Sequence, residues 1–92
     1  MISSICIPRL ESNISKDYIF QTLQKLKVGY IKHIAEIPLR NDPTHKRIII
    51  KIEWNTAQKS IDFQQKLANI GSVKLVHNMP WYWKIVTTKT EI

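Results

Sequence analysis

Six basic side chains stand within or beside stretches that alternate polar and apolar residues, the pattern of half-buried strands. They are Arg9, Arg40, Lys46, Arg47, Lys51 and Lys84. Lys and Arg on the exposed side of a strand, or in the loop before it, can contact the phosphates of a nucleic acid. The ordinary interpretation is that a Lys on an exposed strand solvates the sheet and deters edge pairing.

Tyr82 is the candidate for stacking on a base, because it shares its parity with Lys84 and any aromatic ring offers a face to a base. Trp81 and Trp83 have the opposite parity and are expected in the core together with Trp54. If the strand register shifts by one residue, Trp81 and Trp83 face solvent instead and provide two stacking platforms. The register of this segment therefore decides how much stacking surface the chain has.

The sequence lacks the residue patterns of metal, cofactor and hydrolase sites. Cys6 is the single cysteine, and His33, His45 and His77 are scattered without zinc-ligand spacing. The chain has only two glycines, no glycine-rich phosphate loop and no Ser/His/Asp constellation. We therefore expect a protein that is not an enzyme and that uses no cofactor and no metal.

The composition predicts a single domain over residues 1–92 with a polyanionic partner. Hydrophobic residues make up 43% and charged residues 23% of the 92, values in the globular range. A formal net charge of +7 favours a partner such as nucleic acid. The longest apolar run, at 48–50, is far too short to span a bilayer, so no membrane association is expected.

Periodicity predicts strands at 3–8, 48–54, 73–77 and 81–88. A strand at 30–39 is predicted from its β-type composition, since its isoleucines fall three apart and a bulge would break the alternation. A first helix is expected to begin after Ser15 and to end at Gly29. A second is expected to begin at Asn55 or Thr56, to end at Gly71, and to bury a stripe. The stripe consists of Ala57, Ile61, Gln64 and Ala68, flanked by Ser60 and Leu67.

Two helices separated by paired strands predict an α+β, ferredoxin-like βαββαβ plan. In this plan a four-stranded antiparallel sheet carries both helices on one face and leaves the other face open. The residues expected on the open face are Cys6, Ile49, Lys51 and Glu53, with Tyr82 and Lys84 at one edge. Glu53 is the one acidic residue expected there, and it would repel phosphate.

Two stretches resemble the RNA recognition motif (RRM) family. Residues 5–10, Ile-Cys-Ile-Pro-Arg-Leu, are similar to the short apolar pattern of the family's first strand. Residues 47–54, Arg-Ile-Ile-Ile-Lys-Ile-Glu-Trp, are similar to the basic-aromatic octet of its third strand. The resemblance implies an RRM-like fold and RNA binding. The family stacks bases on aromatics at three positions that here are Cys6, Ile49 and Lys51, so that platform is absent.

The whole chain also resembles short RRM-like proteins encoded by large DNA viruses of protists and algae. The resemblance rests on Ile-Pro-Arg at 7–9, Trp-Asn at 54–55 and Pro-Trp-Tyr-Trp-Lys at 80–84. It implies a viral protein located inside the cell, in the host cytoplasm or in a virion, and not secreted.

These observations predict a small, non-enzymatic RRM-like module that binds RNA or single-stranded nucleic acid mainly through charge, with weak sequence preference. In an alternative of a different class, Cys6 and Ile49 form a contact face for a homodimer or for a viral or host protein, as in a virion-structural module. In a third, Arg9 and Asn55 serve an acylphosphatase-like enzyme, although that family's Gly-rich loop is missing between Pro8 and Ser15.

Overall fold

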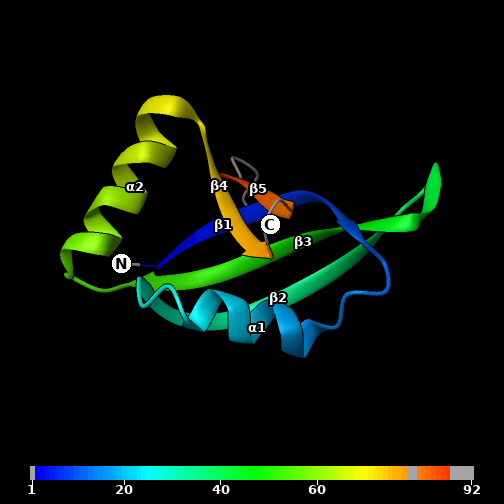
Figure 1. Cartoon of the computed structure of the whole chain (residues 1–92), viewed down its shortest axis with the longest axis horizontal. Helices are drawn as coiled ribbons and strands as arrows, with labels where there is room; N and C mark the ends of the chain where they lie inside the picture. The colour runs from blue at the N-terminus through cyan, green and yellow to red at the C-terminus, as the bar shows by residue number, and fades with distance from the viewer. Residues whose placement is uncertain (1, 79–80, 88–92) are drawn as a thin grey trace.

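A computed structural model describes residues 2–78 and 81–87 of the chain. The elements, in chain order, are β1 (Ile2–Glu11), α1 (Lys16–Gln24), β2 (Gly29–Leu39), β3 (Asp42–Trp54), α2 (Gln58–Ile70), β4 (Ser72–Asn78) and β5 (Trp81–Thr87) (Figure 1). Residues 79–80, between the strands predicted at 73–77 and 81–88, and the predicted strand end at 88 lie outside the described residues.

The strands of the described chain form one antiparallel sheet in the order β2-β3-β1-β5-β4. The prediction of a four-stranded sheet is wrong, because β4, expected as a strand at 73–77, pairs with β5 along its length and adds a fifth strand at the edge. Val73 and Leu75 of β4 turn toward the core, so this strand has its own apolar side to bury. As a result, β5 lies inside the sheet and not at its edge.

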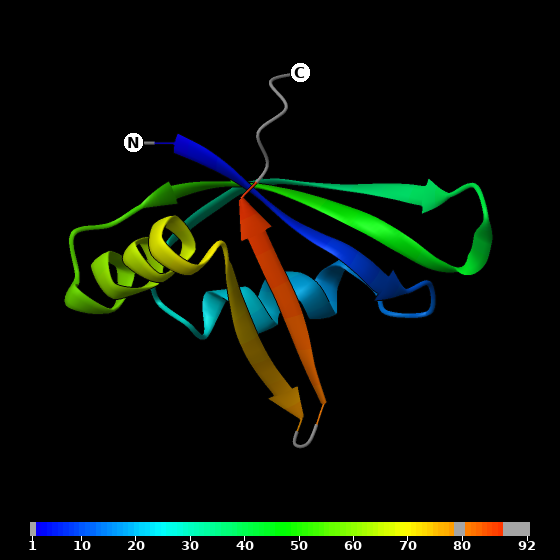
Figure 2. The ribbon, with the colours of Figure 1, turned by 90° about the horizontal axis from the view of Figure 1, so that it is seen from above.

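The sheet is paired unevenly on the two sides of β1. β1 and β3 pair from Ile2 with Glu53 to Glu11 with His45. Among the described residues, β1 and β5 pair only at Ile5 with Thr87 and at Cys6 with Val86. Figure 2 shows the consequence: the β4–β5 hairpin runs away from the other three strands at a steep angle.

α1 begins as predicted and ends earlier than predicted. The Ser15 hydroxyl oxygen accepts a hydrogen bond from the Tyr18 N–H at 3.1 Å and caps the first turn. The helix ends at Gln24, and Gly29 starts β2. A Cβ on Gly29 would lie 2.2 Å from the Glu53 carbonyl oxygen, so this glycine is required by the close approach of two strands.

α2 buries a face rotated by one residue from the predicted one. Its buried residues are Ser60 and Leu67, seven apart, whereas Ile61 is 38% exposed. Neither predicted residue caps the helix, since the N-cap is Ala57, which has no side-chain hydrogen bond. The helix ends at Gly71 as predicted, with a φ of 92° that a glycine adopts without strain.

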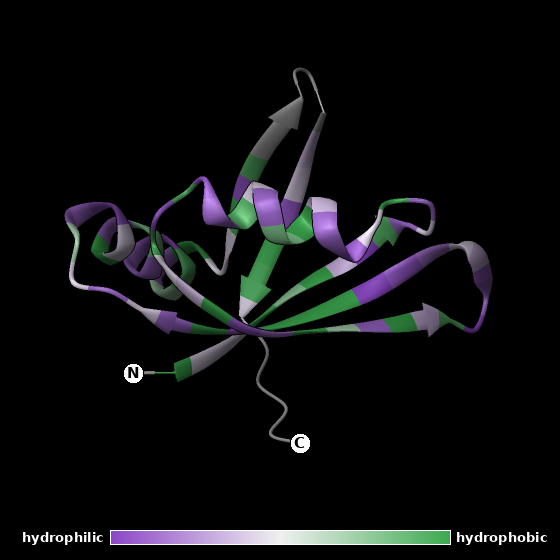
Figure 3. Cartoon of the chain, turned by 90° about the horizontal axis from the view of Figure 1, so that it is seen from below, coloured by the Kyte–Doolittle hydropathy of each residue, from purple (hydrophilic) through white to green (hydrophobic). Residues whose placement is uncertain are grey.

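Both helices pack on the same face of the sheet, as predicted. Ile19 and Leu23 of α1 and Leu67 of α2 share one core cluster with inward residues of the strands. The fully buried strand residues of this cluster are Ile5, Ile7, Ile48, Ile50, Ile52 and Ile85. Figure 3 shows hydrophobic segments of the strands converging near the middle of the sheet, next to α1. The opposite surface, which we call the open face, carries the alternate residues.

Candidate nucleic-acid interface

The register of β5 follows the expected parity. Trp83 is 5% exposed and belongs to the core, whereas Tyr82 is 49% exposed on the open face. Trp54 is half-buried against the core, with its ring 5.7 Å from that of Phe63. The side chain of Trp81 lies outside what the structure describes. Tyr82 is therefore the stacking candidate on the described part of β5, and the register shift is not observed.

A row of mostly apolar residues crosses the open face, one from each strand. From β2 to β4 this row is Ala35, Ile49, Cys6, Val86 and Ser72. Cys6 is buried and the other four are partly buried. With strands about 4.8 Å apart, the row is about 19 Å long. We call it the central row.

Three exposed cations border the central row on one side. Arg47 stands two residues before Ile49 on β3, and Lys84 two residues before Val86 on β5. Because β3 and β5 both run antiparallel to β1, the two cations lie on the same side of the row, on strands that diverge beyond the Cys6–Val86 pair (Figure 2). Lys74 of β4 pairs directly with Lys84. We call Arg47, Lys84 and Lys74 the cationic row.

Lys74 is a site residue that the sequence reasoning missed. Its Nζ lies 5.0 Å from the centre of the Tyr82 ring, a cation–π distance. Neither Lys74 nor Lys84 has an ion pair with any residue in 2–78 or 81–87. Two like charges directly opposite each other in a sheet are destabilising. The hairpin therefore bears a charge cost that the fold itself does not require.

A polar row borders the central row on the other side. This polar row consists of Lys51 of β3 and its two pairing partners, Ser4 of β1 and His33 of β2. Beyond it, the Glu53 carboxylate is 3.0 Å from the Lys32 ammonium, and this hydrogen bond lowers the pKa of Glu53. The repulsion of phosphate expected from Glu53 is thus offset by a neighbouring cation.

Cys6 offers little surface to a protein partner. Its side chain is 5% exposed although it belongs to the open face, and this burial raises the pKa of its thiol. The Arg47 charge opposes that rise, which agrees with the placement of Arg47 beside the central row. Ile49, the other residue of the expected contact face, is half-buried.

Lys46, expected to contact phosphate from the loop before the third strand, lies instead within β3 on the core side of the sheet. It shares its parity with Ile48 and Ile50 and points toward the core side, where it is 8% exposed. Its ammonium donates to the Ile14 carbonyl oxygen at 2.6 Å and to the Glu36 carboxylate. Lys46 therefore joins β3 to the segment before α1 and offers little surface to phosphate, since its side chain is 10% exposed.

Arg9 and Arg40 lie near the β2–β3 turn, away from the central row. The Arg9 guanidinium is paired with the Asp42 carboxylate. Asp42 also accepts hydrogen bonds from the Thr44 N–H at 3.0 Å and the Thr44 hydroxyl, and the His45 ring lies 3.1 Å from it. Arg40 is exposed in the turn and forms no ion pair within the described part of the chain.

The arrangement required by the acylphosphatase-like alternative is not formed. Arg9 lies near the end of β1 that pairs with Lys46, and Asn55 follows the strand end that pairs with Ile2 and Gly29. The side-chain amide of Asn55 is bound to backbone groups. Its Nδ2 donates to the Lys27 carbonyl oxygen at 2.9 Å, and its Oδ1 accepts from the Ala57 N–H at 3.0 Å.

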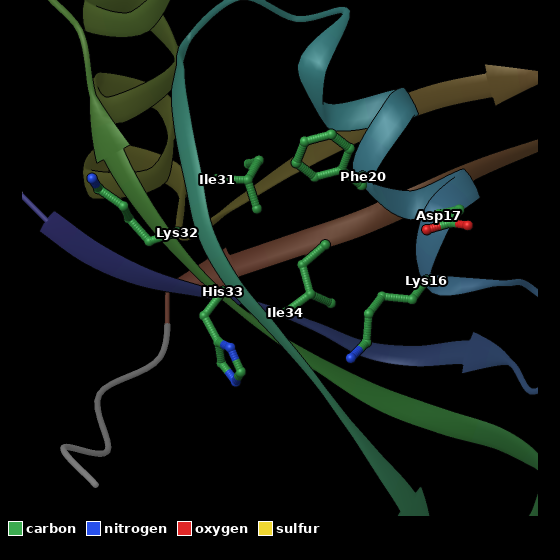
Figure 4. A pocket seen from close by; sticks show the side chains of 7 residues that line it. All are labelled: Lys16, Asp17, Phe20, Ile31, Lys32, His33 and Ile34. Atoms are coloured by element: carbon green, nitrogen blue, oxygen red, sulfur yellow. The ribbon is translucent and has the colours of Figure 1, made fainter.

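A pocket of about 240 Å³ lies between α1 and the edge strand β2. Phe20, Ile31 and Ile34 line its interior, and Figure 4 shows the Asp17 carboxylate pointing away from it. Lys16 and Lys32 also line it. The lining has no hydrogen-bonded nucleophile–base pair of the kind that a hydrolytic site needs.

Comparisons of the chain with protein-family models, with curated proteins and with solved structures found no match. Residues 2–78 and 81–87 contain no group of His, Cys, Asp and Glu that could hold a metal ion. Neither helix in that part of the chain is long and apolar enough to cross a membrane.

Proposed function

We propose that this chain is a small RRM-like module that binds RNA or single-stranded nucleic acid mainly through charge. The observation that carries the proposal is the cationic row of Arg47, Lys84 and Lys74 beside the central row. A strand of nucleic acid has phosphates on one side and bases on the other, and this surface offers cations and apolar contact side by side.

The sheet topology supports the RRM-like part of the proposal. The order β2-β3-β1-β5, with both helices on one face, matches the ferredoxin-like plan if β4 is counted as an additional edge strand. The resemblance to proteins of large DNA viruses stays a prediction from the sequence motifs.

Tyr82 supplies the stacking surface in this proposal. A base that stacks on its ring displaces the Lys74 ammonium from the ring face, and the ammonium then contacts the adjacent phosphate. The mutual repulsion of Lys74 and Lys84 is relieved when a phosphate lies between them. Because these contacts read no base edge, the sequence preference they generate is weak.

Binding of a fluorescent single-stranded RNA across a salt series tests the proposal. Three phosphate contacts on a single strand predict a slope of about −2 in log affinity against log salt concentration. The double variant Lys74→Glu/Lys84→Glu is expected to weaken binding at least about tenfold at low salt, because it reverses the charge of the hairpin.

The double variant Lys59→Glu/Lys66→Glu is the matched control. It makes the same change in net charge on α2, on exposed residues, and leaves the open face intact. The proposal is contradicted if both double variants weaken binding equally, or if the affinity of the unchanged protein ignores salt.

A further inference from the structure

The two borders of the central row differ in charge. The cationic row carries three exposed positive charges, with no ion pair to a described residue. The opposite side carries Lys51, then the Lys32–Glu53 pair, whose charges cancel, and the exposed Tyr30. A polyanionic backbone is therefore attracted to one border of the row more strongly than to the other.

We infer that a bound single strand lies along the cationic row with its phosphates, and places its bases over the central row with their edges toward Ser4, Lys51 and His33. This inference rests on the proposed function. Arg47 and Lys51 are four residues apart on β3, about 13 Å along the strand, a span that a nucleotide bridges together with the reach of the two long side chains. The polar row is then the part of the surface that reads base identity.

The chemistry of the polar row favours a guanine over a cytosine. Lys51 is a donor only, while Ser4 and His33 can each donate or accept. On its Hoogsteen edge guanine presents two adjacent acceptors, O6 and N7, to a Lys, whereas the corresponding edge of cytosine carries the N4 amino donor and no acceptor. The preference is modest because one charged donor supplies most of it.

Short RNA probes that alternate U with G, or U with C, separate a base contact from a phosphate contact. The unchanged protein is expected to bind the U/G probe several-fold, up to about tenfold, more tightly than the U/C probe. Lys51→Met is expected to remove this preference and to change the U/C affinity by less than about twofold. Lys84→Met is expected to weaken both probes equally and to reduce the salt slope by about 1.

Lys66→Met, an exposed helix residue given the same substitution, is the control and is expected to change neither the preference nor the salt slope. Circular dichroism checks that each variant is folded. The inference is overturned if Lys51→Met weakens both probes equally and lowers the salt slope, because Lys51 then contacts phosphate; the proposed function would survive that result. If the unchanged protein binds neither probe at low salt, the proposed function fails as well.

Discussion

Two basic side chains near the β2–β3 turn are held by carboxylates, whereas in the β4–β5 hairpin two lysines face each other across the strands. Arg9 is paired with Asp42, and Lys46 with Glu36. Lys74 and Lys84 pair with each other in register and with no acid among the described residues. Basic side chains in the two regions therefore differ in what lies opposite them: a carboxylate in the first region and another cation in the second.

The difference separates charges that build the fold from charges that have no ion pair among the described residues. Lys46 gains a carboxylate and a carbonyl oxygen when the chain folds, so its hydrogen bonds add to the free energy of unfolding. Lys84 gains only a like charge opposite it, so folding brings it repulsion. The +7 net charge of the chain therefore overstates the charge available to a polyanion.

Substitution of the buried lysine tests the first half of this comparison and has the largest expected effect. Lys46→Met keeps the apolar stem but leaves the Glu36 carboxylate and the Ile14 carbonyl oxygen without their donor. We expect the free energy of unfolding to fall by about 2 kcal/mol, measured by urea denaturation. Lys66→Met, on an exposed helix face, should change it by less than about 0.5 kcal/mol. Equal effects of the two substitutions would remove the distinction.

Acid should weaken the β2–β3 end of the molecule. The hydrogen bond from Lys46 lowers the pKa of Glu36, and those from Thr44 lower the pKa of Asp42. A carboxyl whose pKa is lower in the folded than in the unfolded state stabilises the folded protein. This contribution is complete above the unfolded pKa of about 4 and is lost as pH falls through the folded pKa. We expect the thermal midpoint to be flat near neutrality and to fall below about pH 4.

The Glu36 part of this acid response can be isolated. In Lys46→Met the lysine hydrogen bond that lowers the pKa of Glu36 is absent, so the fall in thermal midpoint between pH 5 and pH 2 should be smaller than in the unchanged protein. An unchanged acid response in this variant would show that Glu36 does not contribute.

Removal of one of the two facing lysines tests the second half of the comparison, the repulsion in the β4–β5 hairpin, and has the smallest expected effect. Lys84→Thr relieves the repulsion with Lys74 and leaves the contact of Lys74 with Tyr82. We expect stability to rise by about 0.2–1 kcal/mol at low salt, with the gain shrinking as salt is added, while RNA binding weakens. Differential scanning calorimetry and the RNA titration measure the two effects. A loss of stability would contradict the assignment of these lysines to ligand binding.

Local patterns predicted the elements and the open face because each depends on neighbours in the sequence. The alternation from Ile48 to Trp54 placed that part of β3 and its outward residues, although β3 begins earlier, at Asp42, and Ser15 was correctly identified as a cap. The same alternation, continued back by two residues, would have placed Lys46 with the core. Lys74 was missed because its position depends on the register of the β4–β5 hairpin, a property of two strands together.

Positions fixed by distant contacts were not predictable in this way. Gly29 looked like a helix stop, but its role depends on the Glu53 carbonyl oxygen, which approaches from a strand 24 positions away along the chain (53 − 29). The ion pair of Arg9 with Asp42 likewise joins the end of β1 to the β2–β3 turn.

Because the pairing of β1 with β5 is short, the Cys6 thiol can report local unfolding of the β4–β5 hairpin. Among the described residues, β5 pairs with β1 only at Ile5–Thr87 and Cys6–Val86, and Cys6 is the single thiol of the chain. Detachment of this hairpin by local unfolding would expose a thiol that is otherwise 5% exposed. The rate of Cys6 alkylation in the native state therefore measures how often the candidate interface opens.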